Sequence, residues 1–216
     1  MKLSNLFKRK EKGNIVVLDD VLYNSLFADN PDNFTNLKEH KAISWIYESK
    51  TPTIDELENI ANDNSVESRL KFLALYTALR QGLKIPQKTY FGTVLEVPME
   101  GGYDVLAFYS DSRARYYNYS GKVVIYEGGR ADVDDTIANA NSMAIQVCNV
   151  LAPWEKERLP KPKGDVIRIS FLVSDGLYFG NSSIKTIGND QMASAIFGKG
   201  AEVMKALLSE TNKPAQ

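Results

Sequence analysis

Cysteine and histidine are almost absent from this chain: one residue of each type, Cys148 and His40, occurs among 216. A disulfide framework, a Cys/His zinc site and a Cys–His nucleophile pair each need more of these residues, unless Cys148 and His40 meet in space. Cys148 also falls on the apolar stripe of a predicted helix, which is typical of a buried structural cysteine. The sequence therefore argues against all three chemistries, and the low cysteine content favours a cytoplasmic location.

The chain also has no large excess of positive or negative residues. The formal net charge is −1 and the pI is about 6.0, so no overall basic field would draw the chain to nucleic acid or to an anionic membrane. No apolar run approaches the roughly 18 residues of a membrane-spanning helix. Residues 1–13 are basic but lack the apolar stretch of a signal peptide, and we expect a flexible tail there. Nucleic acid and membrane are therefore not expected as partners.

Recognisable catalytic, metal-binding and cofactor-binding motifs are also lacking. The acidic run Asp132–Asp135 could supply oxygen ligands to a divalent cation, but acids at a helix start also cap free N–H groups, and we favour capping, with Asp132 as the N-cap. The glycines at 128–129 and 198–200 lack the spacing of a phosphate-binding loop. Ser174 and Asp175 have no histidine nearby in the sequence to act as a base. We therefore assign no catalytic residue, metal or cofactor, and lean away from an enzyme.

The chain does contain enough apolar sequence for a core. Hydrophobic residues make up 44% and charged residues 25%, which is typical of a globular domain. From 14 to 86 the apolar residues recur at helical spacing, most clearly at 65–82, where Ser65 is the predicted N-cap. A shorter helix is predicted after Thr53, whose hydroxyl also suits a cap. We expect this N-terminal helical segment to be acidic and to fold as one unit with the rest of the chain.

After residue 86 the apolar period changes from helical to strand-like, with turn signals at close spacing. Four strands between 89 and 127 predict an antiparallel meander. A helix over 132–151 follows, then a hairpin whose turn we place at Asp175 and Gly176, where positive φ angles would give a type I′ turn. The C-terminal region predicts one helix, or two that are separated at its glycines.

This order of elements predicts the fold class α+β. We expect residues 87–216 to form an antiparallel sheet, a four-stranded meander plus a hairpin, packed with helices and preceded by the N-terminal helical segment. The strand over 103–109 is apolar on both of its faces. Helices are therefore expected on both sides of the sheet.

The hairpin RARYYNYSGKVVIYE, residues 113–127, contains the candidate binding surface. If Ser120 and Gly121 form a two-residue turn, Arg115 lies opposite Tyr126, and the side chains along each strand alternate between the two faces of the hairpin. One face is then apolar, with Val123 and Ile125 on it, and the other is basic and aromatic. The candidate partner-binding or ligand-binding residues are Arg113, Arg115, Tyr117, Tyr119, Lys122 and Tyr126.

Three interpretations of this basic and aromatic face remain open. A cation–π contact between Arg115 and Tyr126, worth about 0.5–1 kcal/mol if exposed, would explain the residues without any ligand, and we favour it. The face could instead bind a protein, or it could hold a small anion or stacked bases. The acidic N-terminal helices could also cover it, pairing their carboxylates with Arg113 and Arg115.

Two stretches, RARYYNYSGKVVIYE and SDGLYFG, resemble a family of bacterial proteins that has no assigned activity. The resemblance runs from about Tyr103 to Leu208, and the N-terminal helical segment lies outside it. Because the family has no assigned activity, the resemblance implies no catalytic or binding residue.

Together these observations favour a non-enzymatic, protein-binding module of the bacterial cytoplasm. A toxin-neutralising immunity protein is one concrete form, with a toxin as the partner. The alternatives are a protein or enzyme that binds a small anionic ligand in a pocket between sheet and helices, and a sheet platform for RNA. Self-association into a homo-oligomer also stays open.

Overall fold

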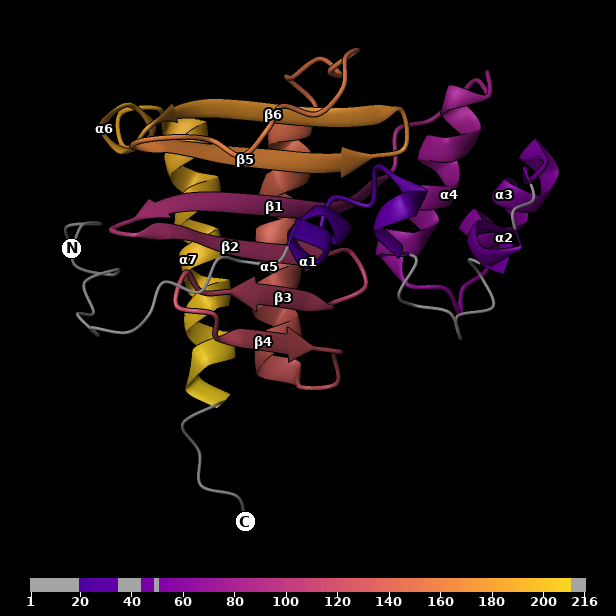
Figure 1. Ribbon diagram of the computed structural model, residues 1–216. Helices are drawn as coiled ribbons and strands as arrows, with labels where there is room; N and C mark the ends of the chain where they lie inside the picture. Colours follow the sequence, from indigo (N-terminus) through magenta and orange to yellow (C-terminus); the bar gives the residue numbers. More distant parts are fainter. Residues whose placement is uncertain (1–19, 35–43, 49–50, 211–216) are drawn as a thin grey trace.

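The computed structural model describes residues 20–34, 44–48 and 51–210, so the basic segment 1–13 and His40 lie outside the described residues. Figure 1 labels the elements of the fold. The described helices are α1 (Asp20–Ser25), the 3-10 helix η2 (Pro31–Phe34), α2 (Ser44–Tyr47), α3 (Ile54–Asn62), α4 (Ser68–Arg80), α5 (Ala131–Cys148), α6 (Ile184–Ile187) and α7 (Gln191–Glu210). The described strands are β1 (Tyr90–Met99), β2 (Gly102–Tyr109), β3 (Ala114–Tyr117), β4 (Val123–Tyr126), β5 (Val166–Val173) and β6 (Gly176–Ser183).

The strands form one antiparallel sheet in the order β4-β3-β2-β1-β5-β6 (Figure 1). Strands β1 to β4 are the predicted meander, and β5 with β6 is the predicted hairpin. The hairpin joins the meander by pairing β5 with β1. The predicted α+β class is therefore confirmed, and β4 and β6 are the two edges of the sheet.

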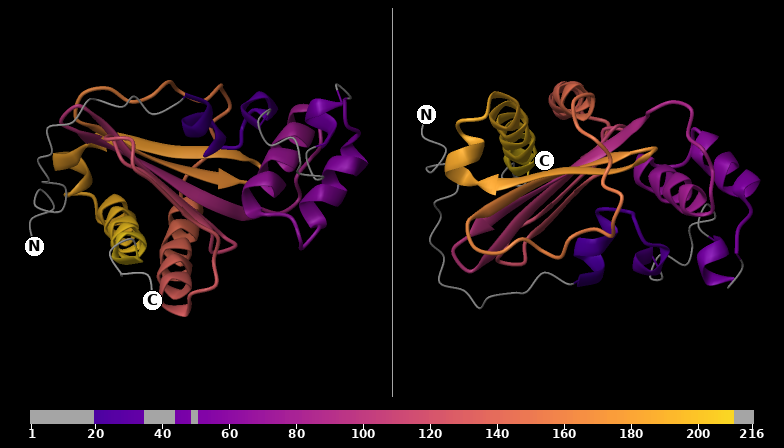
Figure 2. Two further views of the ribbon diagram at one scale, coloured as in Figure 1. Left: turned by 60° about the horizontal axis from the view of Figure 1, so that its bottom comes forward. Right: turned by 90° about the horizontal axis from the view of Figure 1, so that it is seen from above.

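Helices cover both faces of this sheet, as the apolar pattern of β2 predicts. Helices α5 and α7 lie side by side on one face, α1 lies on the other, and α3 and α4 stand at one end (Figure 2). Along β2, Leu106 and Phe108 face α5 and α7. Val105 and Ala107 face the opposite core, which α1 and α4 contribute to. Because side chains alternate between the two faces of a strand, β2 contributes residues to two separate cores.

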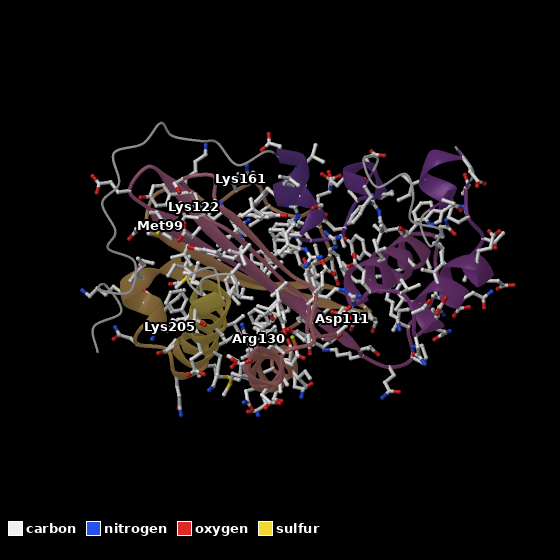
Figure 3. The ribbon with its side chains drawn as sticks, turned by 90° about the horizontal axis from the view of Figure 1, so that it is seen from below. Met99, Asp111, Lys122, Arg130, Lys161 and Lys205 are labelled. Atoms are coloured by element: carbon white, nitrogen blue, oxygen red, sulfur yellow. The ribbon has the colours of Figure 1, made fainter. Side chains whose placement is uncertain are left out.

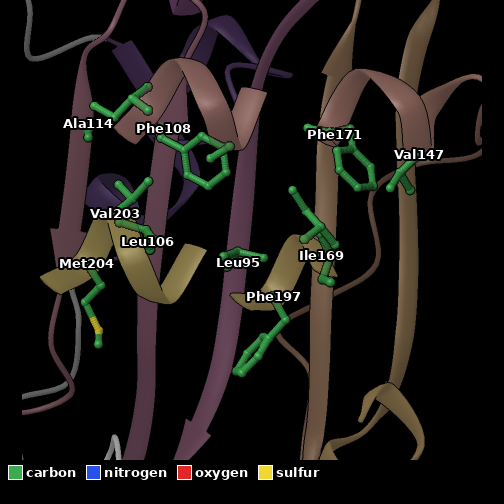
Figure 4. Packing of buried hydrophobic residues seen from close by; sticks show 14 of the residues in the cluster. Leu95, Leu106, Phe108, Ala114, Val147, Ile169, Phe171, Phe197, Val203 and Met204 are labelled. Carbon is green, nitrogen blue, oxygen red and sulfur yellow. The ribbon is translucent and has the colours of Figure 1, made fainter. Parts of the chain in front are cut away.

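The core under α5 and α7 is the larger of the two. Strand residues from β1, β2 and β5 meet one side of each helix there (Figure 4). The labelled members are Leu95, Leu106, Phe108, Ala114, Val147, Ile169, Phe171, Phe197, Val203 and Met204. Helix α7 is continuous through Gly198 and Gly200. Gly200 lies against the sheet, and a Cβ there would overlap Leu95 Cδ1 unless the Leu95 side chain shifted.

The predicted helix caps have mixed outcomes. Thr53 caps α3, as predicted, and the structure adds a reciprocal bond from Glu56 that completes a capping box. Ser65 does not cap α4, whose N-cap is Glu67, because Ser65 donates instead from its N and Oγ to Asp63 Oδ1 at 2.8 and 2.7 Å. Asp132 lies within the first turn of α5 rather than at its N-cap. The acids there still meet the positive end of the helix dipole.

The turn between β5 and β6 is displaced by one residue from its predicted place. Val173 pairs with Gly176, so Ser174 and Asp175 form the turn. Neither has a positive φ, and the predicted type I′ turn at Asp175–Gly176 is wrong. The physical reason is that Ser174 is anchored: its Oγ accepts from Thr89 N at 2.9 Å and its own N donates to Thr89 O at 2.8 Å.

Candidate functional site

The hairpin that contains the candidate residues has a different register from the predicted one. Asn118 N donates to Lys122 O at 2.8 Å, and Gly121 N donates to Asn118 O at 2.9 Å. The loop therefore holds three residues instead of two. Gly121 has a φ of 87°, which a three-residue loop with a left-handed final position requires. The side-chain oxygen of Asn118 also accepts from Ser120 N and Oγ, which stabilises the wider loop.

This shift of one residue moves every β4 side chain to the opposite face. Arg115 pairs with Ile125, and Ala114 pairs with Tyr126. Tyr126 packs against the core under α5 and α7, whereas Val123 and Ile125 are 44% and 60% exposed on the other face. The predicted cation–π contact between Arg115 and Tyr126 is therefore wrong. Arg115 donates instead from its Nη1 to the carbonyl oxygen of Tyr126 at 2.9 Å.

Arg115 is a buried structural residue. It is 7% exposed, its Nη2 donates to Glu127 Oε1 at 2.6 Å, and its Nη1 also donates to Ala114 O at 3.0 Å. Glu67 Oε2 lies 4.0 Å from the same guanidinium. Tyr117 is 3% exposed and belongs to the core on the α4 side. Neither side chain offers a surface to a partner.

Arg113 is held by acids from three elements. Its Nε donates to Glu127 Oε2 at 2.9 Å, and its Nη1 donates to Asp111 Oδ2 at 2.8 Å. Glu67, at the start of α4, lies 3.9 Å away. The expectation that carboxylates of the N-terminal helical segment pair with these arginines is thus met by Glu67. The positive charge of the hairpin is balanced within the fold, which weakens the interpretations that need a basic surface.

The other three candidates lie apart from each other. Tyr126 OH donates to Asp134 Oδ1 at 2.7 Å on the α5 side. Tyr119 lies at the loop, where its N donates to the buried Asp104 at 2.9 Å. Lys122 is exposed at the start of β4. The six candidate residues therefore do not form one surface.

What the hairpin does expose is the edge of β4. Because Asn118 N bonds to Lys122 O, Lys122 and every second residue after it direct their backbone groups to β3. The backbone groups of Val123 and Ile125 point to the open edge of the sheet, where β4 is outermost. Figure 3 looks from this side and labels Lys122 before the strand and Arg130 beyond it. The β-branched residues 123–125 correctly indicate a strand. The predicted register, however, placed the side chains of Val123 and Ile125 on the core face instead of the exposed face.

A buried polar cluster connects α1 to the sheet strands β1 and β5. Tyr23 OH donates to Glu96 Oε1 at 2.6 Å, and Arg168 Nη1 lies 3.7 Å from Glu96 Oε2. Glu96 is 1% exposed, and its Oε2 has no hydrogen-bond partner among the described residues. Burial raises the pKa of this carboxyl, against the opposing effects of Tyr23 and Arg168. Three distant segments build this cluster, so no local sequence pattern predicts it.

The described part of the chain contains a small hollow and a larger groove. A small apolar one of about 20 Å³ lies between α7 and the sheet, near Leu95 and Met204. A larger, open groove of about 730 Å³ lies between α4, the residues after α1, and the segment 153–158. Neither is lined by Arg113 or Arg115, so the anionic-ligand pocket expected around these arginines is not formed by either hollow.

The described residues give few starting points for catalysis. Burial raises the pKa of the Cys148 thiol to about 12, so it is not a thiolate nucleophile at neutral pH. Within the described ranges, no cluster of three or more histidine, cysteine or acidic residues has a metal-binding arrangement. No described helix has both the length and the apolar character needed to cross a membrane.

The fold and its edge define the class of this protein: an α+β protein built on one antiparallel sheet, in which β4 is an outermost strand. Comparisons with protein-family models, with curated proteins and with solved structures found no match for the chain. The bacterial family that its two motifs resemble therefore stays a prediction.

Proposed function

We propose that this protein is a non-enzymatic protein-binding module, and that its partner adds an extended strand to the edge of β4. The observation that carries the proposal is the exposure of Val123 and Ile125, at 44% and 60%, on an edge strand. The outward N–H and C=O groups of Val123 and Ile125 can form backbone hydrogen bonds to an added strand. Their side chains can contact alternate residues of that strand. This is the usual mode of recognition by strand addition.

The surroundings of β4 support a protein over a nucleic acid. The arginines of the hairpin pair with Glu67, Asp111 and Glu127, so they are not available to phosphates. Exposed β-branched side chains on an open edge are also the feature that proteins usually protect with charge or a covering segment. A bacterial toxin that is neutralised by strand addition is the concrete partner we propose, with the encounter in the cytoplasm.

The test is affinity capture from the native host followed by reconstitution with the purified partner. Ile125→Lys places a charge on the contact face, and Ile125→Pro removes the outward N–H while edge strands tolerate proline. Both should weaken binding at least about tenfold, a loss of about 1.4 kcal/mol. The matched control is Ile145→Lys on α5, where Ile145 is 45% exposed. It should bind as the wild type does.

Two results would contradict this proposal. Retention of the purified partner by both Ile125 variants, with binding unchanged, would place the contact elsewhere. A stable dimer of the isolated protein that dissociates on Ile125→Lys, measured by light scattering, would assign the β4 edge to a second copy of this chain instead.

A further inference from the structure

The groove of about 730 Å³ has one wall, the segment 153–158, that hydrogen bonds fix at two points. Arg158 joins this wall to α1 and the residues after it, with its Nε donating to Asp29 Oδ2 at 2.6 Å and its Nη2 to Asn24 Oδ1 at 2.7 Å. Trp154 joins the same wall to β6, through N donating to Leu177 O at 2.7 Å. The opposite wall is the C-terminal half of α4. Because the 153–158 wall is held in place, a ligand would bind without ordering it first.

The α4 wall presents hydrogen-bond donors that lack partners. Tyr76 OH and the Arg80 guanidinium both line the groove, and among the described residues neither has a side-chain hydrogen bond or ion pair. Stacking of Tyr76 on Phe72, at 5.4 Å between ring centroids, orients this hydroxyl. The Arg80 and Arg158 guanidinium groups are close enough to oppose the burial and the Asp29 carboxylate that raise the pKa of Tyr76. These donors together suit a carboxylate.

The facing wall presents acceptors. Glu155 and Glu157 line the groove, and their carboxylates have no ion-pair partner in the part of the chain that the structure describes. Lys156 lies between these two acids in the sequence and also lines the groove, together with Arg80 of the other wall. A ligand that carries both charges would match side chains of both signs that line one groove.

We propose that this groove binds a small zwitterion of the amino-acid or short-peptide class. Its carboxylate is held by Tyr76 and Arg80, and its ammonium group by Glu157 and Glu155. A nucleotide is disfavoured because acids balance the basic side chains of the lining, and an acyl chain is disfavoured because the lining is mostly polar. The volume lies within the range of small-ligand sites, roughly 300–1,000 Å³. This site is separate from the β4 edge and does not depend on it.

The test is thermal unfolding of the whole protein with single L-amino acids and with alanyl dipeptides as probes at millimolar concentration. A binding zwitterion should raise the midpoint by at least about 2 °C, and calorimetry then gives its affinity. Free amino acids and dipeptides are compared separately, so the two sources are distinguished. The N-acetylated and the amidated forms of the best probe should each lose binding, because each lacks one charge.

Variants then locate the site. Arg80→Gln should weaken binding at least about tenfold, and Tyr76→Phe, which keeps the stacked ring, should weaken it several-fold. Lys205→Gln on α7, away from the groove, is the control and should bind normally. The proposal is overturned if no probe shifts the midpoint, if the blocked forms bind as well as the free ones, or if Arg80→Gln and Lys205→Gln bind alike.

Discussion

At the residue scale, burial decides what a charged side chain does in this protein. Arg115 and Glu96 are 7% and 1% exposed; the hydrogen-bond partners of Arg115 lie in its own hairpin, and that of Glu96 lies in a distant segment. Arg115 has Glu127 and two backbone carbonyls, whereas Glu96 has one hydrogen bond, from Tyr23. Burial of the Glu96 carboxylate is costly, because its Oε2 has no hydrogen-bond partner among the described residues and only Arg168, at 3.7 Å, offsets its lost hydration.

Glu96→Gln should therefore reduce the pH dependence of stability. Because the pKa of Glu96 is raised above its ordinary 4.5, this group stabilises the fold fully below that value, and the contribution is lost as the pH rises through the raised pKa. Urea unfolding over a pH series from about 4 to 8 should show the wild type losing stability relative to the variant as the pH rises. Glu100→Gln, on an exposed turn, is the control. Parallel pH curves for the wild type and Glu96→Gln would contradict the explanation.

At the scale of single elements, local propensity and packing compete, and α7 shows both. The helix has glycines at two positions two residues apart, and glycine is a poor helix former. A Cβ at Gly198 would meet nothing within 4 Å, whereas a Cβ at Gly200 would overlap Leu95 Cδ1 in the core. Gly198 therefore only weakens the helix, and Gly200 allows α7 to approach β1.

Alanine at these two positions should have opposite effects. Gly198→Ala should stabilise the protein by about 0.5–1 kcal/mol through helix propensity. Gly200→Ala gains the same propensity but overpacks the core, and it should destabilise by about 1–3 kcal/mol. Thermal unfolding of both variants beside the wild type measures the difference. Equal shifts in the same direction would show that the approach of α7 to Leu95 is not tightly packed.

At the scale of the whole molecule, segments far apart in sequence hold each other on the sheet. Arg158 precedes β5, yet its guanidinium bonds Asp29 and lies 4.0 Å from the centre of the Phe27 ring. Asp29 is 8% exposed, so this ion pair is largely removed from water. The residues after α1 are thus attached to the sheet by a segment more than a hundred positions away in the chain.

Arg158→Met should loosen this attachment. Removing one partner of a largely buried pair leaves Asp29 uncompensated, and we expect a loss of about 2–3 kcal/mol in the free energy of unfolding. Hydrogen exchange should increase most at residues 20–34. Lys199→Met, which breaks an exposed pair with Glu202 on α7, should cost less than about 0.5 kcal/mol. Similar losses in both variants would show that the Arg158 contact adds little.

The sequence by itself determined the order of the strands and main helices, the α+β class, the cap at Thr53 and the coverage of both sheet faces. These follow from periodicity and capping, which depend on residues close together in the chain. It did not determine the hairpin register, because a loop of two or three residues uses the same letters and a shift of one residue reverses each face.

Only the tertiary structure decided which charges are buried, which edge is open and where a groove lies. Arg115 and Glu96 were placed in the interior by contacts with Glu67, Tyr23 and Arg168, and the exposure of Ile125 followed from the register of one hairpin. The physical reason is that burial and pairing depend on segments that meet only after folding, whereas the sequence pattern describes what each segment does alone.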